Sequence, residues 1–275
     1  MARRRPRALR GRVSLRVTFV GPGVTVQDRG RRGLMHLGVP RGGPLDPSLF
    51  ERVRASLGNA PESAAVEIPW HRARFVAERD VVVSVDGAVR ALTAGEALEV
   101  DARAYAVRYL GLRGGVEVPT ALGGRGTLLV AGVGGVDGRA LRRGDVLRAG
   151  DAWGEPTAEG ALSVERVREV AVHPLDDAPA ACREALFEGD FTVTPKVDRV
   201  GMRLHGAMPR VASGHGASVP LVRGAIEVTP EGELIVMGAD HPTTGGYPLV
   251  GVVARSSQGP LAQLRPGASF RFVRA

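Results

Sequence analysis

Hydrogen-bonding side chains gather in residues 24–46, a stretch that is otherwise rich in glycine and proline. Gln27, Asp28, Arg29 and Arg31 follow an apolar start, and six glycines and prolines come soon after them. Each glycine adds entropy to the unfolded chain and weakens regular pairing, so stability alone does not explain this composition. Arginine binds carboxylate, bicarbonate or phosphate through paired hydrogen bonds, and aspartate can orient a ligand or transfer a proton. We therefore expect Gln27, Asp28 and Arg31 to contribute to a site.

A second set of similar side chains lies in the C-terminal half. Asp198, Arg199 and Arg203 repeat the combination of acid and arginine, with the arginines as candidates for anion binding. Further along, Asp240 and Tyr247 enclose two threonines and two glycines. Hydroxyls and glycine amides can converge on a small anionic or amide ligand, although the same residues also fit a tight hairpin loop. The candidates in this loop are Asp240, Thr243, Thr244, Gly245, Gly246 and Tyr247.

Each of these residues also has a structural interpretation. Asp28–Arg29 and Asp198–Arg199 could be internal salt bridges that hold strand ends. Asp240 could cap its own loop, and Tyr247 could fill the mouth of a barrel. The residue pattern leaves both interpretations open.

The sequence lacks the common nucleotide, hydrolase and metal motifs. Lys196 is followed by Val197, which excludes a Walker loop, and Gly132–Gly138 has Asp137 in place of the third glycine of a dinucleotide fingerprint. We interpret Gly132–Gly138 as a turn. Neither Gly-x-Ser-x-Gly nor His-Glu-x-x-His occurs, so we expect no metal site and regard the six histidines as solvated or structural.

Short strands separated by glycine and proline turns account for most of the chain, which predicts a mainly β protein. Their spacing is typical of a barrel or a sandwich. In the first half the predicted strands are 15–20, 65–68, 81–85, 97–100, 105–109, 116–118 and 127–130. Residues 151–165 predict a linker, followed by a strand at 167–172, a helix at 179–188 capped by Asp177, and strands from Phe191 onward.

The clearest helix is predicted over residues 46–59. Asp46 is a good N-cap, Pro47 suits the first helical position, and Gly58 supplies a left-handed stop. An apolar stripe is formed by Leu49, Phe50, Val53 and Leu57. Asp46 therefore has a structural role at least as strong as any catalytic one.

Composition narrows the class of protein. The 275 residues are 44% hydrophobic and 4% aromatic, which favours a packed, strand-rich fold. The net charge is +8, but six positive charges are arginines within residues 1–13, a segment without acids, and the remainder carries +2. Because few aromatic residues are present to stack on bases, we expect no nucleic-acid partner. We predict that residues 1–13 form a disordered basic tail.

The cysteine count and the hydropathy pattern bear on location. Cys182 is the only cysteine, which rules out an intramolecular disulfide and fits a reducing compartment. No apolar run approaches transmembrane length, and Arg16 interrupts any secretory apolar region. We therefore expect a cytoplasmic protein without a membrane partner.

Two parts of the chain echo each other, which predicts two related β units. Gln27-Asp28-Arg29 is echoed by Val197-Asp198-Arg199, and Ala65-Val66-Glu67-Ile68 by Ala225-Ile226-Glu227-Val228. Each unit would bring an Asp-Arg pair to a comparable place, although chance recurrence is the alternative. We expect the first unit at 14–160 and the second at 166–275.

Longer motifs, in a fixed order, resemble one protein family. They are Thr-Val-Gln-Asp-Arg-Gly-Arg at 25–31, His-Leu-Gly-Val-Pro-Arg-Gly-Gly-Pro-Leu-Asp at 36–46, Gly-Asn at 58–59, Glu-Ile at 67–68, Asp-Arg-Val-Gly-Met-Arg-Leu-His-Gly at 198–206, Gly-Ala-Ile at 224–226, Asp-His-Pro-Thr-Thr-Gly-Gly-Tyr-Pro at 240–248 and Gln-Leu-Arg-Pro-Gly at 263–267. Together they are similar to the C-type subunit of 5-oxoprolinase. The same family is described as allophanate hydrolase subunit 2 and as one half of the carboxyltransferase domain of urea carboxylase.

The resemblance implies a fold of two cyclophilin-like closed β-barrels with a few short helices. It also implies a lactam hydrolase subunit that is inactive alone and acts with the B-type subunit of 5-oxoprolinase and a third, LamB/YcsF-type subunit. The implied reaction opens 5-oxo-L-proline to L-glutamate with ATP as co-substrate. Two alternatives remain: a carboxyltransferase half that receives biotin on a partner, and a regulatory antagonist of a kinase inhibitor.

The sequence departs from the family pattern at a few positions. Met202 stands where an aromatic residue is common, Glu227 where Gln is frequent, and Ser213-Gly214-His215 where Ser-Glu-Gly is common. A Gln to Glu change in a site adds a charge that urea, lactam and carboxylate ligands would feel differently. These differences leave the substrate open.

We expect one pocket to draw on both units, because lactam and urea groups are poor electrophiles that need a polarised oxygen and a held nitrogen. We assign orientation or proton transfer to Asp28, Asp240 and Tyr247. We assign substrate or anion binding to Gln27, Arg31, Asp198, Arg199, Arg203, Thr243, Thr244, Gly245 and Gly246.

Overall fold

The computed structural model describes residues 12–157, 167–211 and 217–275. The chain forms two compact units: Met1–Arg31 with Gly42–Ser163, and Arg32–Arg41 with Val164–Ala275. We refer to them as unit 1 and unit 2. Residues 1–11 of the predicted tail and 158–165 of the predicted linker lie outside the described residues. Arg12 and Val13 belong to the first strand and not to a tail.

The described part of unit 1 contains nine strands, one α-helix and a 3-10 turn. Its elements are β1 (Arg12–Val20), β2 (Thr25–Gln27), α1 (Pro47–Ser56), β3 (Ala65–Pro69), β4 (Arg72–Ala77), β5 (Val81–Val85), β6 (Ala88–Leu92), β7 (Ala97–Asp101), β8 (Val107–Leu112), η2 (Leu129–Ala131) and β9 (Val146–Ala149). A further 3-10 turn, η1 (Met35–Leu37), lies in the segment that groups with unit 2.

The strands of unit 1 form two sheets around one core. One sheet has the order β7-β4-β1-β9 and the other β2-β3-β8-β5-β6. Leu15 and Phe75 from the first sheet and Val66 and Leu110 from the second belong to the same buried cluster. Isolated bridges join Val116 to Ala64 and to Ala149 between the two sheets. The two sheets are therefore linked by isolated bridges at Val116, and the described strands of unit 1 form no continuous closed ladder.

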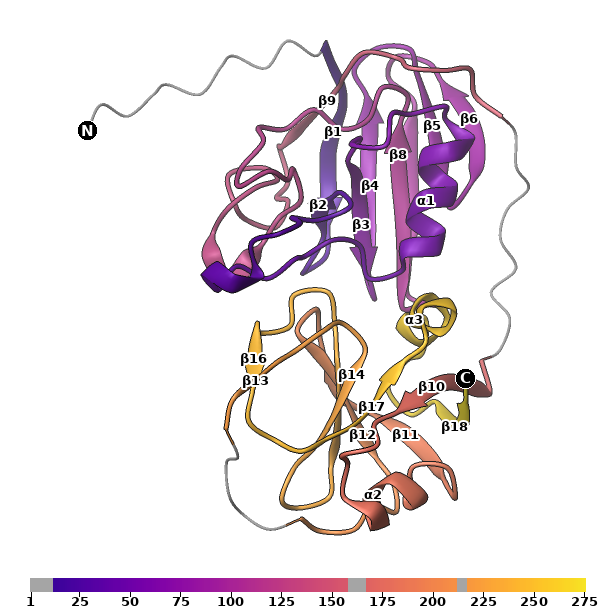
Figure 1. Ribbon diagram of the computed structural model, residues 1–275. Coiled ribbons are helices and arrows are strands. Elements are labelled where there is room, and N and C mark those ends of the chain that lie inside the picture. Colours follow the sequence, from indigo (N-terminus) through magenta and orange to yellow (C-terminus); the bar gives the residue numbers. More distant parts are fainter. Residues whose placement is uncertain (1–11, 158–166, 212–216) are drawn as a thin grey trace. The chain divides into compact units, whose positions relative to one another are not determined.

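Helix α1 begins and ends as the sequence predicts. Asp46 accepts hydrogen bonds from the amides of Ser48 and Leu49, and Gly58 has a φ of 60°, which favours glycine. The helix packs on β8, β5 and β6 (Figure 1). Its buried face consists of Leu49, Phe50, Val53 and Ser56.

Unit 2 contains a closed barrel with the strand order β10-β17-β14-β15-β12-β11-β18. Strands β10 and β18 pair in parallel and close it. Its elements are β10 (Glu169–Pro174), α2 (Ala180–Ala185), β11 (Asp190–Val197), β12 (Gly201–His205), β13 (Val219–Pro220), β14 (Ala225–Val228), β15 (Leu234–Met237), β16 (Thr244–Gly245), β17 (Leu249–Val253), α3 (Arg255–Ala262) and β18 (Ser269–Arg274).

The core of the unit 2 barrel follows strict alternation along the strands. Ile226 and Val228 of β14 and Leu234 and Val236 of β15 point into the barrel. Their neighbours Ala225 and Met237, together with Leu221, Ile235 and Leu249, form a separate small cluster. Glu227 alternates with Ile226 and Val228, so it lies on the same outer face of the barrel as this second cluster.

The mainly β prediction is confirmed, and several element predictions need correction. The segment 127–130 is not a strand: it forms η2, and Leu128 bridges back to Val133, because the glycines that follow turn the chain within a few residues. Residues 116–118 provide only the two isolated bridges at Val116. The N-cap of α2 is Pro179, not Asp177. Strand β4 alternates arginine with small or apolar residues over most of its length. It is not among the strands predicted from the sequence.

None of the helices in the described part of the chain is both long and apolar enough to span a membrane.

Candidate functional site

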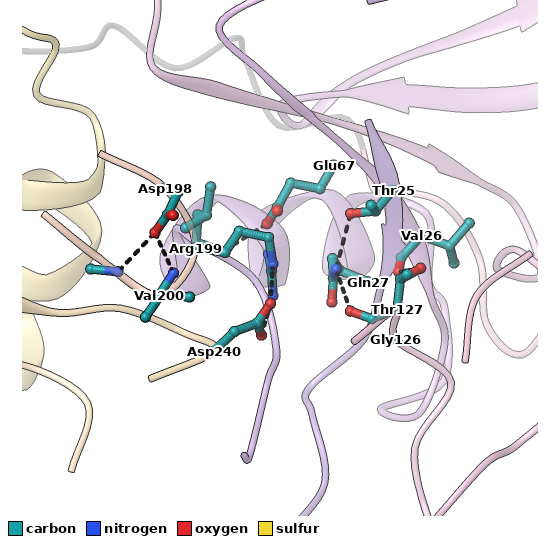
Figure 2. Close-up of polar contacts among 12 residues, drawn as sticks. Thr25, Val26, Gln27, Glu67, Gly126, Thr127, Asp198, Arg199, Val200 and Asp240 are labelled. Atoms are coloured by element: carbon teal, nitrogen blue, oxygen red, sulfur yellow. Dashed lines mark hydrogen bonds and ion pairs between the residues drawn. The ribbon is translucent and has the colours of Figure 1, made fainter. Parts of the chain in front are cut away.

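The end of β2 in unit 1 is held by a buried glutamine. The Gln27 side-chain amide donates to Thr25 Oγ1 at 3.0 Å and to the Thr127 carbonyl at 3.1 Å. Thr127 in turn donates from its hydroxyl to the Val26 carbonyl at 3.0 Å. Figure 2 shows Gln27 between these two threonines. Gln27 Oε1 is buried and has no hydrogen-bond partner among the described residues.

Asp28 and Arg31 fasten the loop at 121–127 to the same strand end. Asp28 accepts from the amides of Gly30 at 2.9 Å and Arg125 at 2.5 Å. Arg31 is 1% exposed and donates to the carbonyls of Ala121 at 3.1 Å and Gly126 at 2.7 Å. These contacts show a loop-holding role for both side chains, and a direct role in ligand binding stays a prediction.

A row of polar groups crosses the sheet of unit 1 beside helix α1. In register, Thr25 of β2 lies opposite Glu67 of β3, which lies opposite Tyr109 of β8. The Tyr109 hydroxyl donates to Glu67 Oε2 at 2.6 Å and accepts from the Asp46 amide at 3.0 Å. The Leu45 amide also donates to Glu67 Oε2, at 2.7 Å. Burial, together with the nearby Glu67 and Asp46 carboxylates, raises the pKa of Tyr109 well above its ordinary value.

In unit 2 the corresponding Asp-Arg pair is arranged differently. The Arg199 guanidinium binds Asp240 with both prongs, Nε to Oδ2 at 2.7 Å and Nη2 to Oδ1 at 2.9 Å (Figure 2). Both side chains are buried, with 8% and 7% exposed. Asp198 instead accepts from the amides of Val200 at 2.8 Å and Gly201 at 3.1 Å. The Asp198–Arg199 salt bridge considered from sequence is thus wrong in its partner, because Arg199 reaches across to Asp240.

The pair Asp28–Arg29 shows the same change of partner. Arg29 binds Glu51 of α1 through Nε at 2.6 Å and Nη2 at 2.5 Å. Its side chain is 39% exposed and that of Glu51 is 34% exposed. In both units the aspartate shapes its own turn, while the arginine that follows ties the strand end to a distant acid.

The loop at 240–247 covers the outer face of the unit 2 barrel. Its short strand β16 pairs with β13, and the Leu221 amide donates to the Thr243 carbonyl at 3.0 Å. A Cβ atom at Gly245 would lie 2.1 Å from Glu227 Oε1, so a larger residue here would have to displace the Glu227 carboxyl group. The backbone amide of Tyr247 donates a hydrogen bond to the Glu227 carboxyl group. The loop therefore encloses one carboxyl group.

Glu227 is a buried acid in apolar surroundings. It is 4% exposed, and its cross-strand neighbours are Ile235 and Leu249. Glu227 Oε1 has no hydrogen-bond partner among the described residues. Burial raises the pKa of Glu227 above its ordinary value, and the Tyr247 amide offsets part of that rise.

Glu227 lines an open pocket of about 570 Å³ formed by unit 2 alone. The size is within the range of small-molecule sites. Its polar lining consists of Lys196, Asp198, Arg203 and Glu227, and its apolar lining includes Val197, Val200, Ile235 and Met237. Arg203 forms an ion pair with Glu233, and its side chain is 38% exposed.

Most of the predicted site residues fall into three groups, and the remaining ones, Thr243, Thr244 and Gly246, belong to the 240–247 loop and do not line the pocket. Asp198 and Arg203 line the pocket, and Gly245 and Tyr247 contact its buried acid. Arg199 and Asp240 are engaged with each other. The unit 1 residues hold a loop, and the expectation that they share a site with unit 2 stays a prediction.

Glu227 and Glu67 were not among the predicted site residues, although the sequence contained a signal for them. Both are single acids within otherwise apolar strands, at matching places in the internal echo. Burying a charged side chain in a strand costs free energy, so a single acid in an apolar strand indicates a structural partner or a functional role.

One protein family and several curated proteins match most of the chain. The family described as carboxyltransferase domain, subdomain A and B, matches residues 37–274. The chain is 28% identical to the C-type subunit of 5-oxoprolinase from Escherichia coli, over 94% of this chain and 90% of that protein. It is also 28% identical to the urea amidolyase of Lachancea kluyveri, over 94% of this chain and 17% of that protein.

Two solved structures share the fold. A crystal structure of TTHA0988 superposes with a TM-score of 0.86 at 28% identity, covering 98% of this chain and 59% of that one. The urea amidolyase of K. lactis superposes with a TM-score of 0.81 at 26% identity, covering 96% of this chain and 19% of that one. The chain thus spans only part of the solved relatives that it matches.

Proposed function

Because the chain belongs to the carboxyltransferase domain family, subdomain A and B, we propose that it is a subunit of an ATP-dependent 5-oxoprolinase. The complex would convert 5-oxo-L-proline, ATP and water to L-glutamate, with a B-type 5-oxoprolinase subunit and a LamB/YcsF-type subunit as partners. The observation that carries the proposal is the match to nearly the whole of a C-type 5-oxoprolinase subunit. We place this complex in the cytoplasm, since the lone Cys182 is a free, buried thiol.

The chemistry of unit 2 supports this choice. A lactam is a poor electrophile, so its carbonyl oxygen must be polarised and its nitrogen held by an acceptor. The carboxylate of 5-oxo-L-proline calls in addition for a cation. The pocket offers Glu227 as an acceptor and Lys196 and Arg203 as cations. In this proposal Arg199 and Asp240 fix the backbone beside the pocket, and Tyr247 orients Glu227 through its amide. Asp28 and Asp240 then act in orientation, because their oxygens are already engaged.

ATP enters as the co-substrate of the complex. The sequence has no Walker loop, since Lys196 is followed by Val197. Accordingly, we assign no nucleotide contact to this chain and expect its partners to complete the ATP site.

Reconstitution tests the proposal directly. The purified chain, mixed with the B-type and LamB/YcsF-type subunits from the same source, should hydrolyse ATP only when 5-oxo-L-proline is added, and L-glutamate should accumulate in step. Omitting any one subunit is the matched control and should abolish both products. No stimulation by 5-oxo-L-proline with all three subunits present would overturn the assignment.

A carboxyltransferase half of a biotin-dependent urea or amide carboxylase is the second candidate. It is favoured by the family match and by the likeness to urea amidolyases. In that case biotin would be carried by a partner protein, and the chain would bind the acceptor amide. Transfer of labelled carboxyl from a carboxybiotinyl carrier to urea, without ATP hydrolysis driven by 5-oxoproline, would distinguish this candidate from the first.

A further inference from the structure

The carboxyl group of Glu227 is buried between apolar side chains, which is unusual for an acid in a folded protein. Its flanking residues on β15 and β17 are Ile235 and Leu249, and only the Tyr247 amide among the described residues donates to it. One oxygen, Oε1, remains buried without a donor among those residues. Burying an acid with an unused acceptor costs free energy, and such groups are uncommon outside functional sites.

The position of Glu227 in the sheet connects it to the pocket. Arg203 of β12, Ile235 of β15 and Glu227 of β14 are successive cross-strand partners on the outer face of the barrel. All three line the pocket. A ligand in the pocket would thus meet a cation at one end of this row, an apolar side chain in the middle and an acceptor at the other end.

Lys196 adds a second cation to the Arg203 end. It is exposed, lines the pocket and makes no ion pair with any described residue. Arg203 is partly neutralised by Glu233, and the pocket also holds Asp198, whose Oδ1 accepts from the Val200 and Gly201 amides. Lys196 is therefore the pocket cation that is not held in an ion pair with a described residue. The ligand that complements this row is small, carries a hydrogen-bond donor such as an amide N–H, and carries a carboxylate a few atoms away.

We propose that Glu227 is the specificity-determining acceptor of a pocket in unit 2 that binds a lactam carboxylate by its N–H at Glu227 and by its carboxylate at Lys196 and Arg203. The choice of 5-oxo-L-proline within this class rests on the proposed function. Gly245 covers Glu227 Oε1, and rotation about the terminal side-chain torsion, which is broad for glutamate, turns a carboxylate oxygen toward the ligand.

Direct binding to the isolated full-length chain tests this inference without ATP or partners. Calorimetric titration should show saturable binding of 5-oxo-L-proline, weaker binding of 2-pyrrolidinone, which lacks the carboxylate, and weaker binding of N-methyl-5-oxo-L-proline, which lacks the N–H. Glu227→Met keeps the length of the side chain and removes the acceptor. It should weaken 5-oxo-L-proline binding by roughly 10- to 100-fold, the value of a hydrogen bond to a charged group.

The N-methyl ligand makes the test specific to one hydrogen bond. Its affinity should be nearly the same for the wild-type chain and for Glu227→Met, because neither combination can form the bond. Glu231→Met, at an exposed acid in the β14–β15 turn, is the matched control and should bind all three ligands as the wild type does. Thermal unfolding should show that Glu227→Met is folded and close to the wild type in stability, so a loss of binding cannot be attributed to misfolding.

Three outcomes would overturn the inference. They are absence of saturable binding at millimolar concentrations, equal affinity for the N–H and N-methyl ligands, and an unchanged affinity in Glu227→Met. If only the role assigned to Glu227 is wrong, the reconstituted wild-type complex still hydrolyses ATP in response to 5-oxo-L-proline. If only the proposed function is wrong, this chain still binds the ligand while the complex shows no ATP hydrolysis dependent on 5-oxoproline.

Discussion

Two glutamates at matching positions of the two units are treated in opposite ways. Glu67 of unit 1 lies between Thr25 and Tyr109 and accepts from a hydroxyl and an amide. Glu227 of unit 2 lies between Ile235 and Leu249 and keeps one oxygen without a donor among the described residues. Both are almost wholly buried. The neighbours on the adjacent strands, rather than the strand itself, therefore decide whether a buried acid is structural or available to a ligand.

The same contrast extends to the two arginines that follow the aspartates. Arg29 forms a half-exposed pair with Glu51 on helix α1, whereas Arg199 forms a buried, two-pronged pair with Asp240 on the loop that covers Glu227. Removing the partner of a buried charge costs more free energy of unfolding than removing the partner of an exposed charge. In unit 2, the Arg199–Asp240 ion pair thus fixes the loop over the pocket. This loop covers Glu227, whose Oε1 has no donor among the described residues.

Removing one member of the buried pair should have the largest effect. Asp240→Asn leaves the Arg199 charge buried, so we expect a loss of about 3–5 kcal/mol in the free energy of unfolding. Glu51→Gln removes the acid that Arg29 and Arg54 share in unit 1, where the side chains are partly exposed, and should cost about 1 kcal/mol or less per pair. Urea unfolding of the two variants provides the comparison.

If the two substitutions cost the same, the contrast between a buried and an exposed pair is wrong. Because Asp240→Asn also loosens the covering loop, a spectroscopic probe on each unit would show that the loss is confined to unit 2.

Identical substitutions at the two glutamates give the next effect in size. Glu67→Met leaves the Tyr109 hydroxyl and the Leu45 amide without their acceptor, so we expect a loss of about 2–4 kcal/mol. Glu227→Met removes a carboxyl group that has only the Tyr247 amide as a donor among the described residues, so the loss should be smaller, about 1 kcal/mol or less. Chemical denaturation at neutral pH measures both. A loss at Glu227 as large as that at Glu67 would show that Glu227 has a structural partner after all.

The sequence was sufficient where local rules govern. The cap at Asp46, the left-handed Gly58 and the strand at 81–85 are all as predicted, because capping and alternation act over a few residues. It failed at 127–130, where an apolar run resembles a strand but has no partner strand to pair with in the described part of the chain. Strand formation depends on distant partners, which no local pattern reveals.

The site was predictable in its elements but not in its pairings. The 240–247 loop and Asp198 were identified from residue type, yet the partner of Arg199 lies 41 residues away and could not be read from its neighbours. The importance of Glu227 depends on Ile235 and Leu249 lying on either side of it, which is a matter of register. The sequence shows an acid within an apolar strand. Only the pairing of the strands shows that one oxygen of this acid, Glu227 Oε1, has no donor among the described residues.

The smallest expected effect is a pH dependence that belongs to Glu227 alone. Burial raises the pKa of Glu227 in the folded chain, so the folded state binds this proton more tightly than the unfolded state does. The penalty for holding the carboxylate is present at neutral pH and is relieved as the pH falls through the raised pKa. Glu227→Gln should therefore be slightly more stable than the wild type near about pH 7, and the difference should shrink toward about pH 4, near the ordinary glutamate value.

Arg203, Lys196 and Asp198 share the pocket in both proteins, so their contributions to the pH dependence of stability largely cancel in the difference. A stability difference that stays constant across this pH range would mean that Glu227 titrates as an exposed acid does, and the contrast with Glu67 would then rest on hydrogen bonding alone.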